Sequence, residues 1–197
     1  MFNANTDYFF GNSWLIRVIN KLKKENRFNF LIFLATIFLG SLFLTLSAKV
    51  KVPLYPIPMT LQPLAVLMIS MLFGRNLAIT TVGFYIFQGL LGLPVFAFGG
   101  GLAYIFGPTG GFILGFFIAA FVVGELADRG WGEKYITSLL CMFLGYLIIY
   151  LFGLCYFTFL LGFEIMFEKA VYPFMMKDFY TFLFGGFLIP QIWKLAK

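Results

Sequence analysis

The stretch GLLGLPVFAFGGGLAYIFGPTGGF, from Gly89 to Phe112, decides how this chain folds. It holds eight glycines and two prolines and carries no charged residue. Glycine opens positive φ and proline removes a backbone donor, so this density interrupts a helix. Apolar runs typical of membrane spans flank it on both sides, and irregular backbone beside such spans is tolerated only where protein buries it or it lines a cavity. We expect a re-entrant roof or wall of a ligand site; a simple connecting loop is the alternative.

The composition indicates a polytopic membrane protein. Hydrophobic residues make up 61% of the chain, aromatic residues 21% and charged residues 11%, whereas soluble domains contain about 25% charged residues. The net charge of +6 includes no basic stripe outside the apolar runs, so a nucleic-acid partner is not expected. The chain has no histidine, which excludes histidine-dependent catalysis and most zinc sites. We predict no enzymatic activity, no cofactor and no metal.

Residues 1–27 form the main polar region and are predicted to be a cytoplasmic amphipathic segment. Ser13 is a candidate helix cap in front of one apolar and one basic face. Such a helix is expected to lie on an anionic membrane surface with its apolar side down. The apolar face consists of Trp14, Leu15, Val18, Ile19 and Leu22, and the basic face of Arg17, Lys21, Lys23 and Lys24.

The remaining residues, 28–197, are predicted to be an all-α membrane domain with six transmembrane helices. Several of the apolar segments are near the lower length limit for a span. A proline-rich loop at 49–59 and a polar connection at 164–177 interrupt the pattern. The predicted spans cover residues 28–48, 60–73, 76–91, 109–126, 135–161 and 178–193.

An even number of spans places both termini on one side of the membrane. With the termini inside, ten of the fourteen Lys and Arg residues fall in the internal loops and tails. This imbalance predicts cytoplasmic termini in the cell inner membrane. The proline-rich loop, the glycine-rich stretch and the polar connection then all face outward together.

Three polar residues near the expected outer face are candidate ligand contacts. Lys177 and Asp178, at the mouth of the sixth span, offer one cation and one acceptor, and charges at such depth usually have a function. The alternatives are that Asp178 caps the sixth helix and that Lys177 reaches the lipid headgroups. Gln62, at the start of the second span, can donate and accept at once; a helix–helix hydrogen bond is its alternative role.

The third span and the glycine-rich stretch add further candidates. Tyr85 and Gln88 lie one turn apart and serve either as pocket groups or in packing, while Phe96 and Tyr104 could surround an apolar ring. Thr109 lies in Gly107–Gly111 (GPTGG), which superficially suggests a phosphate loop. No Gly-Lys-Ser/Thr follows, so nucleotide hydrolysis is not expected, and Thr109 is a candidate cap of the fourth helix.

An ordered series of motifs resembles one known family. Pro56–Leu67 (PIPMTLQPLAVL) is similar to the VPxTLQTLAVLL motif of the BioY family, the biotin-binding S components of energy-coupling factor (ECF) transporters. The similarity continues through Tyr85, Gly92–Phe96 (GLPVF) and Gly107–Phe112 (GPTGGF). A weaker likeness to the family's PFxxGDxxK appears in Pro173, Phe174 and Asp178, where Lys177 replaces the glycine and Thr181 the lysine.

The resemblance implies an S-component-like bundle in which residues 28–197 form a biotin-binding domain. Such a protein captures biotin at its outer face and delivers it inward, either as a solitary oligomer or docked on a T-type transmembrane scaffold with two ATPase subunits. Rival functions are an S component for another vitamin-like heterocycle and a membrane-embedded hydrolase or transferase, for which no nucleophile–base pair is found. The candidate biotin contacts are Thr60, Gln62, Tyr85, Gln88, Phe96, Gly99, Gly100, Tyr104, Thr109, Lys177 and Asp178.

Overall fold

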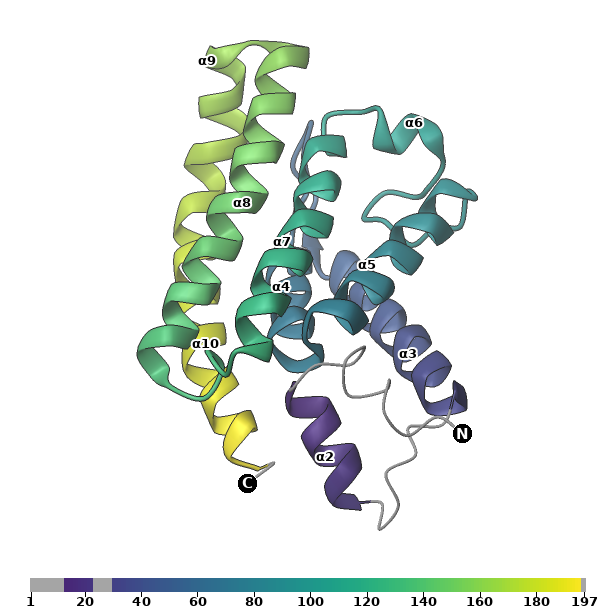
Figure 1. Ribbon diagram of the computed structural model, residues 1–197. Helices are drawn as coiled ribbons and strands as arrows, with labels where there is room; N and C mark the ends of the chain where they lie inside the picture. Colours follow the sequence, from purple (N-terminus) through teal and green to yellow (C-terminus); the bar gives the residue numbers. More distant parts are fainter. Residues whose placement is uncertain (1–12, 23–29, 196–197) are drawn as a thin grey trace.

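Helices make up most of the computed structural model, which describes residues 13–22 and 30–195 (Figure 1). One two-stranded antiparallel ribbon, which pairs Lys51 with Thr60 and Val52 with Met59, interrupts them. The elements are α2 (Trp14–Leu22), α3 (Phe30–Lys49), β1 (Lys51–Val52), β2 (Met59–Thr60), α4 (Gln62–Phe73), α5 (Arg75–Leu90), α6 (Leu102–Ile105), α7 (Gly110–Asp128), α8 (Tyr135–Leu161), α9 (Phe163–Met166), the π-helix η1 (Phe167–Val171) and α10 (Tyr172–Lys194).

The all-α prediction is confirmed, and the six longer helices after α2 fall on the six predicted spans. Helix α8 coincides with the predicted 135–161 and continues unbroken through Gly153. Three helices in the described part of the chain are long and apolar enough to cross a membrane: α3 from Leu31, α7 and α8. Helix α4 has 12 residues and is therefore roughly 18 Å long. It is shorter than a hydrocarbon core of about 30 Å, so the count of six full spans stays a prediction.

Helix α7 is the centre of the bundle, where it packs against α8, α4 and α5. Its contact with α8 is unusually close because of two glycines spaced four residues apart. A Cβ atom on Gly111 would come within 2.5 Å of Phe152 O, and one on Gly115 within 3.0 Å of the Ile149 Cα. Only residues without a side chain allow two helix backbones to approach in this way.

Between α5 and α7, residues 91–109 form the predicted interruption, which we call the roof segment. It lies at the upper right in Figure 1, below the level of α9, and contains the short helix α6. Basic side chains from α3 and β1 hold it by its carbonyls: Lys49 Nζ donates to Pro94 O and Phe96 O, each at 2.6 Å, and Lys51 Nζ donates to Ala97 O. The predicted break in the helical pattern is confirmed.

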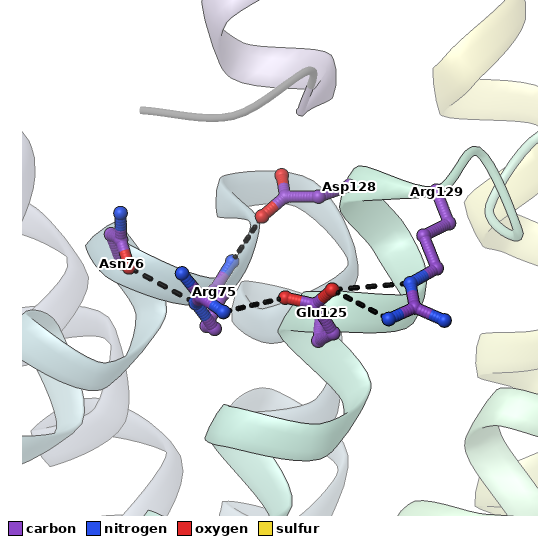
Figure 2. Close-up of polar contacts among 5 residues, drawn as sticks. All are labelled: Arg75, Asn76, Glu125, Asp128 and Arg129. Atoms are coloured by element: carbon purple, nitrogen blue, oxygen red, sulfur yellow. Dashed lines mark hydrogen bonds and ion pairs between the residues drawn. The ribbon is translucent and has the colours of Figure 1, made fainter. Parts of the chain in front are cut away.

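At the opposite end of the bundle, α5 begins beside the end of α7 in a charged cluster of Arg75, Asn76, Glu125, Asp128 and Arg129 (Figure 2). Glu125 pairs with Arg75 and with Arg129, each at 2.9 Å. The carboxylate of Asp128 accepts the backbone N–H of Arg75 at 2.9 Å. An acceptor at this position satisfies one of the free donors at the start of α5.

The N-terminal helix α2 packs on this same end of the bundle, which differs from the expectation that its apolar side lies on a membrane surface. Trp14 Nε1 donates to Ile192 O at 2.7 Å, and Ile16 is 8% exposed. Arg17 pairs with Glu133 at 2.7 Å. Ser13 does not cap the helix, because its buried hydroxyl has no hydrogen-bond partner among the described residues. Lys23 and Lys24 lie outside those residues.

Candidate ligand site

Below the roof segment, the N-terminal halves of α4, α7 and α10 meet α8 around a cavity of about 50 Å³. This is smaller than the 300 to 1,000 Å³ that small-molecule pockets usually have. A ligand of that class therefore has to displace side chains as it enters. The lining residues are Ile57, Pro58, Thr60, Gln62, Pro63, Tyr104, Thr109, Phe112, Ile113, Phe116, Ile149, Tyr150, Phe174, Lys177 and Asp178.

Asp178 lies inside helix α10, which corrects the predicted start of the sixth span. The helix begins at Tyr172 with Val171 in the N-cap position, and Pro173 occupies its first turn. Much of the predicted polar connection at 164–177 is therefore helical, as α9, η1 and the start of α10. The prediction was wrong because proline and charged residues suggested a loop, although proline is well tolerated in a first helical turn. Asp178 cannot cap this helix.

The carboxylate of Asp178 is 7% exposed and has two close partners. The hydroxyl of Tyr150 on α8 donates to Oδ2. Lys177 Nζ forms an ion pair with Oδ1 and donates a hydrogen bond to Thr60 O at 2.9 Å. Oδ1 itself accepts no hydrogen bond from the described residues. Because a carboxylate oxygen has more than one accepting site, Oδ1 can still accept a ligand N–H group beside its ion pair with Lys177.

Gln62 opens α4 on another side of the cavity, followed by Pro63 in the first turn. Its Nε2 donates to the hydroxyl of Tyr85 at 2.7 Å, and its Oε1 accepts from Thr60 Oγ1 at 3.3 Å. Tyr85 is fully buried and does not line the cavity, so it supports Gln62 from behind. The alternative role of Gln62 in a helix–helix hydrogen bond is thus also observed, since Tyr85 belongs to α5.

The roof segment supplies two of its predicted residues to the cavity lining, Tyr104 and Thr109. Phe96 lies behind them, stacked on Tyr104 with ring centroids 5.0 Å apart. Thr109 holds the N-cap position of α7 but does not cap it: its hydroxyl donates instead to Tyr104 O at 3.4 Å. Gly99 and Gly100 belong to the roof segment without lining the cavity.

Gln88 does not line the cavity, and its contacts fit the alternative role in packing. Its Oε1 accepts a hydrogen bond from Ser41 on α3. It therefore ties α5 to α3 instead of facing the cavity.

The structure thus brings Thr60, Gln62, Tyr104, Thr109, Lys177 and Asp178 together around one cavity. Tyr85 and Phe96 support them, and Gln88, Gly99 and Gly100 do not line the cavity. Sequence reasoning missed Tyr150, whose helix α8 contains four tyrosines that no pattern distinguishes. It also missed the apolar wall of Phe112 and Phe174.

Chemically, the lining of the site combines hydrogen-bonding groups with aromatic and aliphatic side chains. It offers a carboxylate, an amide, hydroxyls and an ammonium group, which suits a small ligand with its own donors and acceptors and an apolar ring. Within residues 13–22 and 30–195, no three His, Cys, Asp or Glu side chains gather as metal ligands.

Comparison with known proteins gives consistent matches. A family model described as the BioY family matches residues 20–197. A probable biotin transporter BioY from Pyrococcus horikoshii is 39% identical over 135 residues, which cover 68% of this chain and 79% of that protein. The biotin transporter BioY of Thermotoga maritima is 34% identical over 158 residues, covering 77% and 90%.

One solved structure has a similar fold. It is the crystal structure of the S-component for biotin from an ECF-type ABC transporter, with a TM-score of 0.72 and 18% sequence identity. The superposition covers 83% of this chain and 92% of the other. The likeness of the two helical bundles therefore extends over most of both molecules.

Proposed function

The chain belongs to the BioY family, and from this premise we propose that it is the substrate-capture subunit of a biotin uptake system. It binds biotin at the outer face of the cell inner membrane and delivers it inward, with both termini in the cytoplasm. Its partners are a T-type transmembrane scaffold and two ATPase subunits of an ECF module. The chain itself hydrolyses no nucleotide.

One observation carries this proposal: Oδ1 of Asp178, which is paired with the Lys177 ammonium, and the amide of Gln62 border the same cavity. Biotin has a cyclic urea with two N–H donors and one carbonyl acceptor. A carboxylate with unused accepting capacity suits a urea N–H, and charge-assisted bonds of this kind are roughly twice as strong as neutral ones. The side-chain amide can both donate and accept, as a cyclic urea does.

The rest of the lining suits the rest of the molecule. Phe112 and Phe174 provide apolar surface for the sulfur-containing ring. Lys177 neutralises the buried charge of Asp178 and keeps the carboxylate available as an acceptor, because an unpaired buried charge is strongly disfavoured.

The test is binding by the full chain purified into lipid nanodiscs. Isothermal titration with biotin should give a one-site curve, and mass spectrometry of the gently purified protein should find biotin as the retained small molecule. A different retained heterocycle, with no binding of biotin, would assign the chain to another vitamin. ATP-dependent uptake should appear only when the scaffold and ATPase subunits are co-expressed. Nucleotide hydrolysis by the chain alone would contradict the proposed division of labour.

A further inference from the structure

Tyr85 lies behind the site, where it contacts Gln62 and the roof segment. It is completely buried on α5, and its hydroxyl lies between Gln62 Nε2 at 2.7 Å and Val95 O at 3.1 Å. One hydroxyl thus joins the amide that lines the cavity to the segment that covers it.

The direction of these hydrogen bonds follows from chemistry. A backbone carbonyl can only accept, so the single proton of the Tyr85 hydroxyl goes to Val95 O. The hydroxyl oxygen can then only accept from Gln62. Of the two ends of the amide, only the NH₂ group donates, so Nε2 and not Oε1 must face Tyr85.

The other end of the same amide is held in a matching way. Thr60 Oγ1 accepts the backbone N–H of Gln62 at 3.3 Å and donates its proton to Gln62 Oε1 at 3.3 Å. Both ends of the amide are therefore assigned. What remains for a ligand is one N–H on the Tyr85 side and one accepting lone pair on the Thr60 side.

We infer that Tyr85 is a positioning residue that sets ligand specificity by fixing the polarity of the Gln62 amide. This inference rests on the proposed function. On the Tyr85 side of the amide, a ligand carbonyl oxygen can accept a hydrogen bond from the N–H of Gln62. A ligand donor at the same place is repelled, because it faces another donor. Without the Tyr85 hydroxyl, the amide can turn over within the same volume and offer its oxygen there instead.

The role of the Tyr85 hydroxyl can be tested separately from the packing of its ring. Phe96 meets the ring edge-to-face with centroids 5.4 Å apart. The substitution Tyr85→Phe keeps this contact and removes only the hydroxyl. Tyr156→Phe is a matched control, because the Tyr156 hydroxyl also donates to a roof carbonyl, Phe106 O at 3.1 Å. Tyr156 does not line the cavity.

The experiment compares three ligands by competition binding: biotin, its 2-imino analogue, in which a donor replaces the carbonyl oxygen, and desthiobiotin, which keeps the intact cyclic urea. Tyr85→Phe should lower the preference for biotin over the imino analogue by about tenfold, the usual effect of one lost or mismatched buried hydrogen bond. The preference between biotin and desthiobiotin should stay within twofold. Tyr156→Phe should leave both ratios unchanged.

A double-mutant cycle shows whether Tyr85 acts through the amide. In the Gln62→Leu background, Tyr85→Phe should no longer change the preference for biotin over the imino analogue. An equal loss of affinity for all three ligands, or an effect that persists without Gln62, would reduce Tyr85 to a structural residue and overturn the inference.

A second variant covers the case in which Tyr85→Phe does not fold. Gln62→Glu puts an acceptor in place of the N–H on the Tyr85 side and should therefore also weaken the preference for biotin over the imino analogue. An unchanged preference would again overturn the inference. Failure of the proposed function is distinguishable, because the parent protein would then bind neither biotin nor desthiobiotin.

Discussion

The two ends of the bundle both gather acidic, basic and amide side chains, yet they use them differently. In the charged cluster, both oxygens of Glu125 are taken up by Arg75 and Arg129, and these side chains are 30 to 65% exposed (Figure 2). Beneath the roof segment, the carboxylate of Asp178 is almost completely buried: Oδ2 accepts from Tyr150, and Oδ1 is paired with Lys177 alone and borders a cavity.

Asp128 makes the comparison sharper. Its Oδ1 is also buried without a hydrogen-bond partner among the described residues. It lies against Gly74, where a Cβ atom would overlap it, with the Ser13 Cβ 2.8 Å from the same point. A ligand has no room there. A binding site is therefore marked by unused hydrogen-bonding capacity that borders a cavity, and neither charge nor burial identifies it alone.

The largest effect is expected from Asp178. Asp178→Ala should lower biotin affinity by roughly ten- to a hundredfold or more, because the urea N–H donors would be left without a charged acceptor. Asp178→Ser should bind as poorly as Asp178→Ala, since the residue lies within α10 and caps no helix. The measurement is isothermal titration.

The matched control for this carboxylate is Glu125→Ala at the other end, which should keep affinity within twofold. Near-normal binding by either Asp178 variant would leave the site without its acceptor and remove the contrast between the two ends.

An intermediate effect is expected from Gly89→Ala. A methyl group there would overlap the Phe96 ring, which packs on both Tyr85 and Tyr104. Displacing that ring should cost about 1–3 kcal/mol of stability, as overpacking usually does, and lower biotin affinity several-fold.

The control on the same helix is Gly83→Ala, whose new methyl meets Phe117 at 3.4 Å, an ordinary contact. It should leave biotin affinity unchanged. Thermal unfolding and titration of both variants distinguish the outcomes, and equal melting temperatures for the two would show that the roof segment absorbs the change.

The smallest effect is expected from Arg129→Ala in the charged cluster. Its ion pair with Glu125 is solvent-exposed, with the Arg129 side chain 65% accessible, and such pairs contribute about 0.2–1 kcal/mol. Biotin affinity should not change. A severalfold loss of affinity would mean that the two ends are coupled through α7, and the comparison drawn above would fail.

The fold was predictable from sequence where apolar length alone determines it. The span at 135–161 was predicted with its boundaries, because 27 consecutive uncharged residues leave no choice but a long helix. The start of α10 was not, since Glu164, Glu168 and Lys169 suggested a loop where α9 and η1 continue the helical path. Charged residues indicate that a segment is exposed, but they do not show whether its backbone is a loop or a helix.

The site was predictable where one residue type is rare. Gln62 and Asp178 stand out in an apolar chain. Tyr150 does not, because the chain has ten tyrosines and 29 phenylalanines. The sequence left Gln88, three residues after Tyr85, open between a pocket role and a role in packing. Such residues differ by about 60° around a helix axis, enough for Gln88 to meet Ser41 on α3 while Tyr85 meets Gln62.

The glycine contacts between α7 and α8 determine which wall of the cavity is stiff. At Gly111 and Gly115 the two backbones already touch, so neither helix can be pushed toward the other. Because the cavity measures only about 50 Å³, room for a ligand has to come from elsewhere. The roof segment, held by hydrogen bonds to its carbonyls, and the first turns of α10 form other walls, and we expect these to yield. Part of the binding free energy is therefore consumed in deforming these two parts, and substitutions that soften them can tighten binding without adding any contact to the ligand.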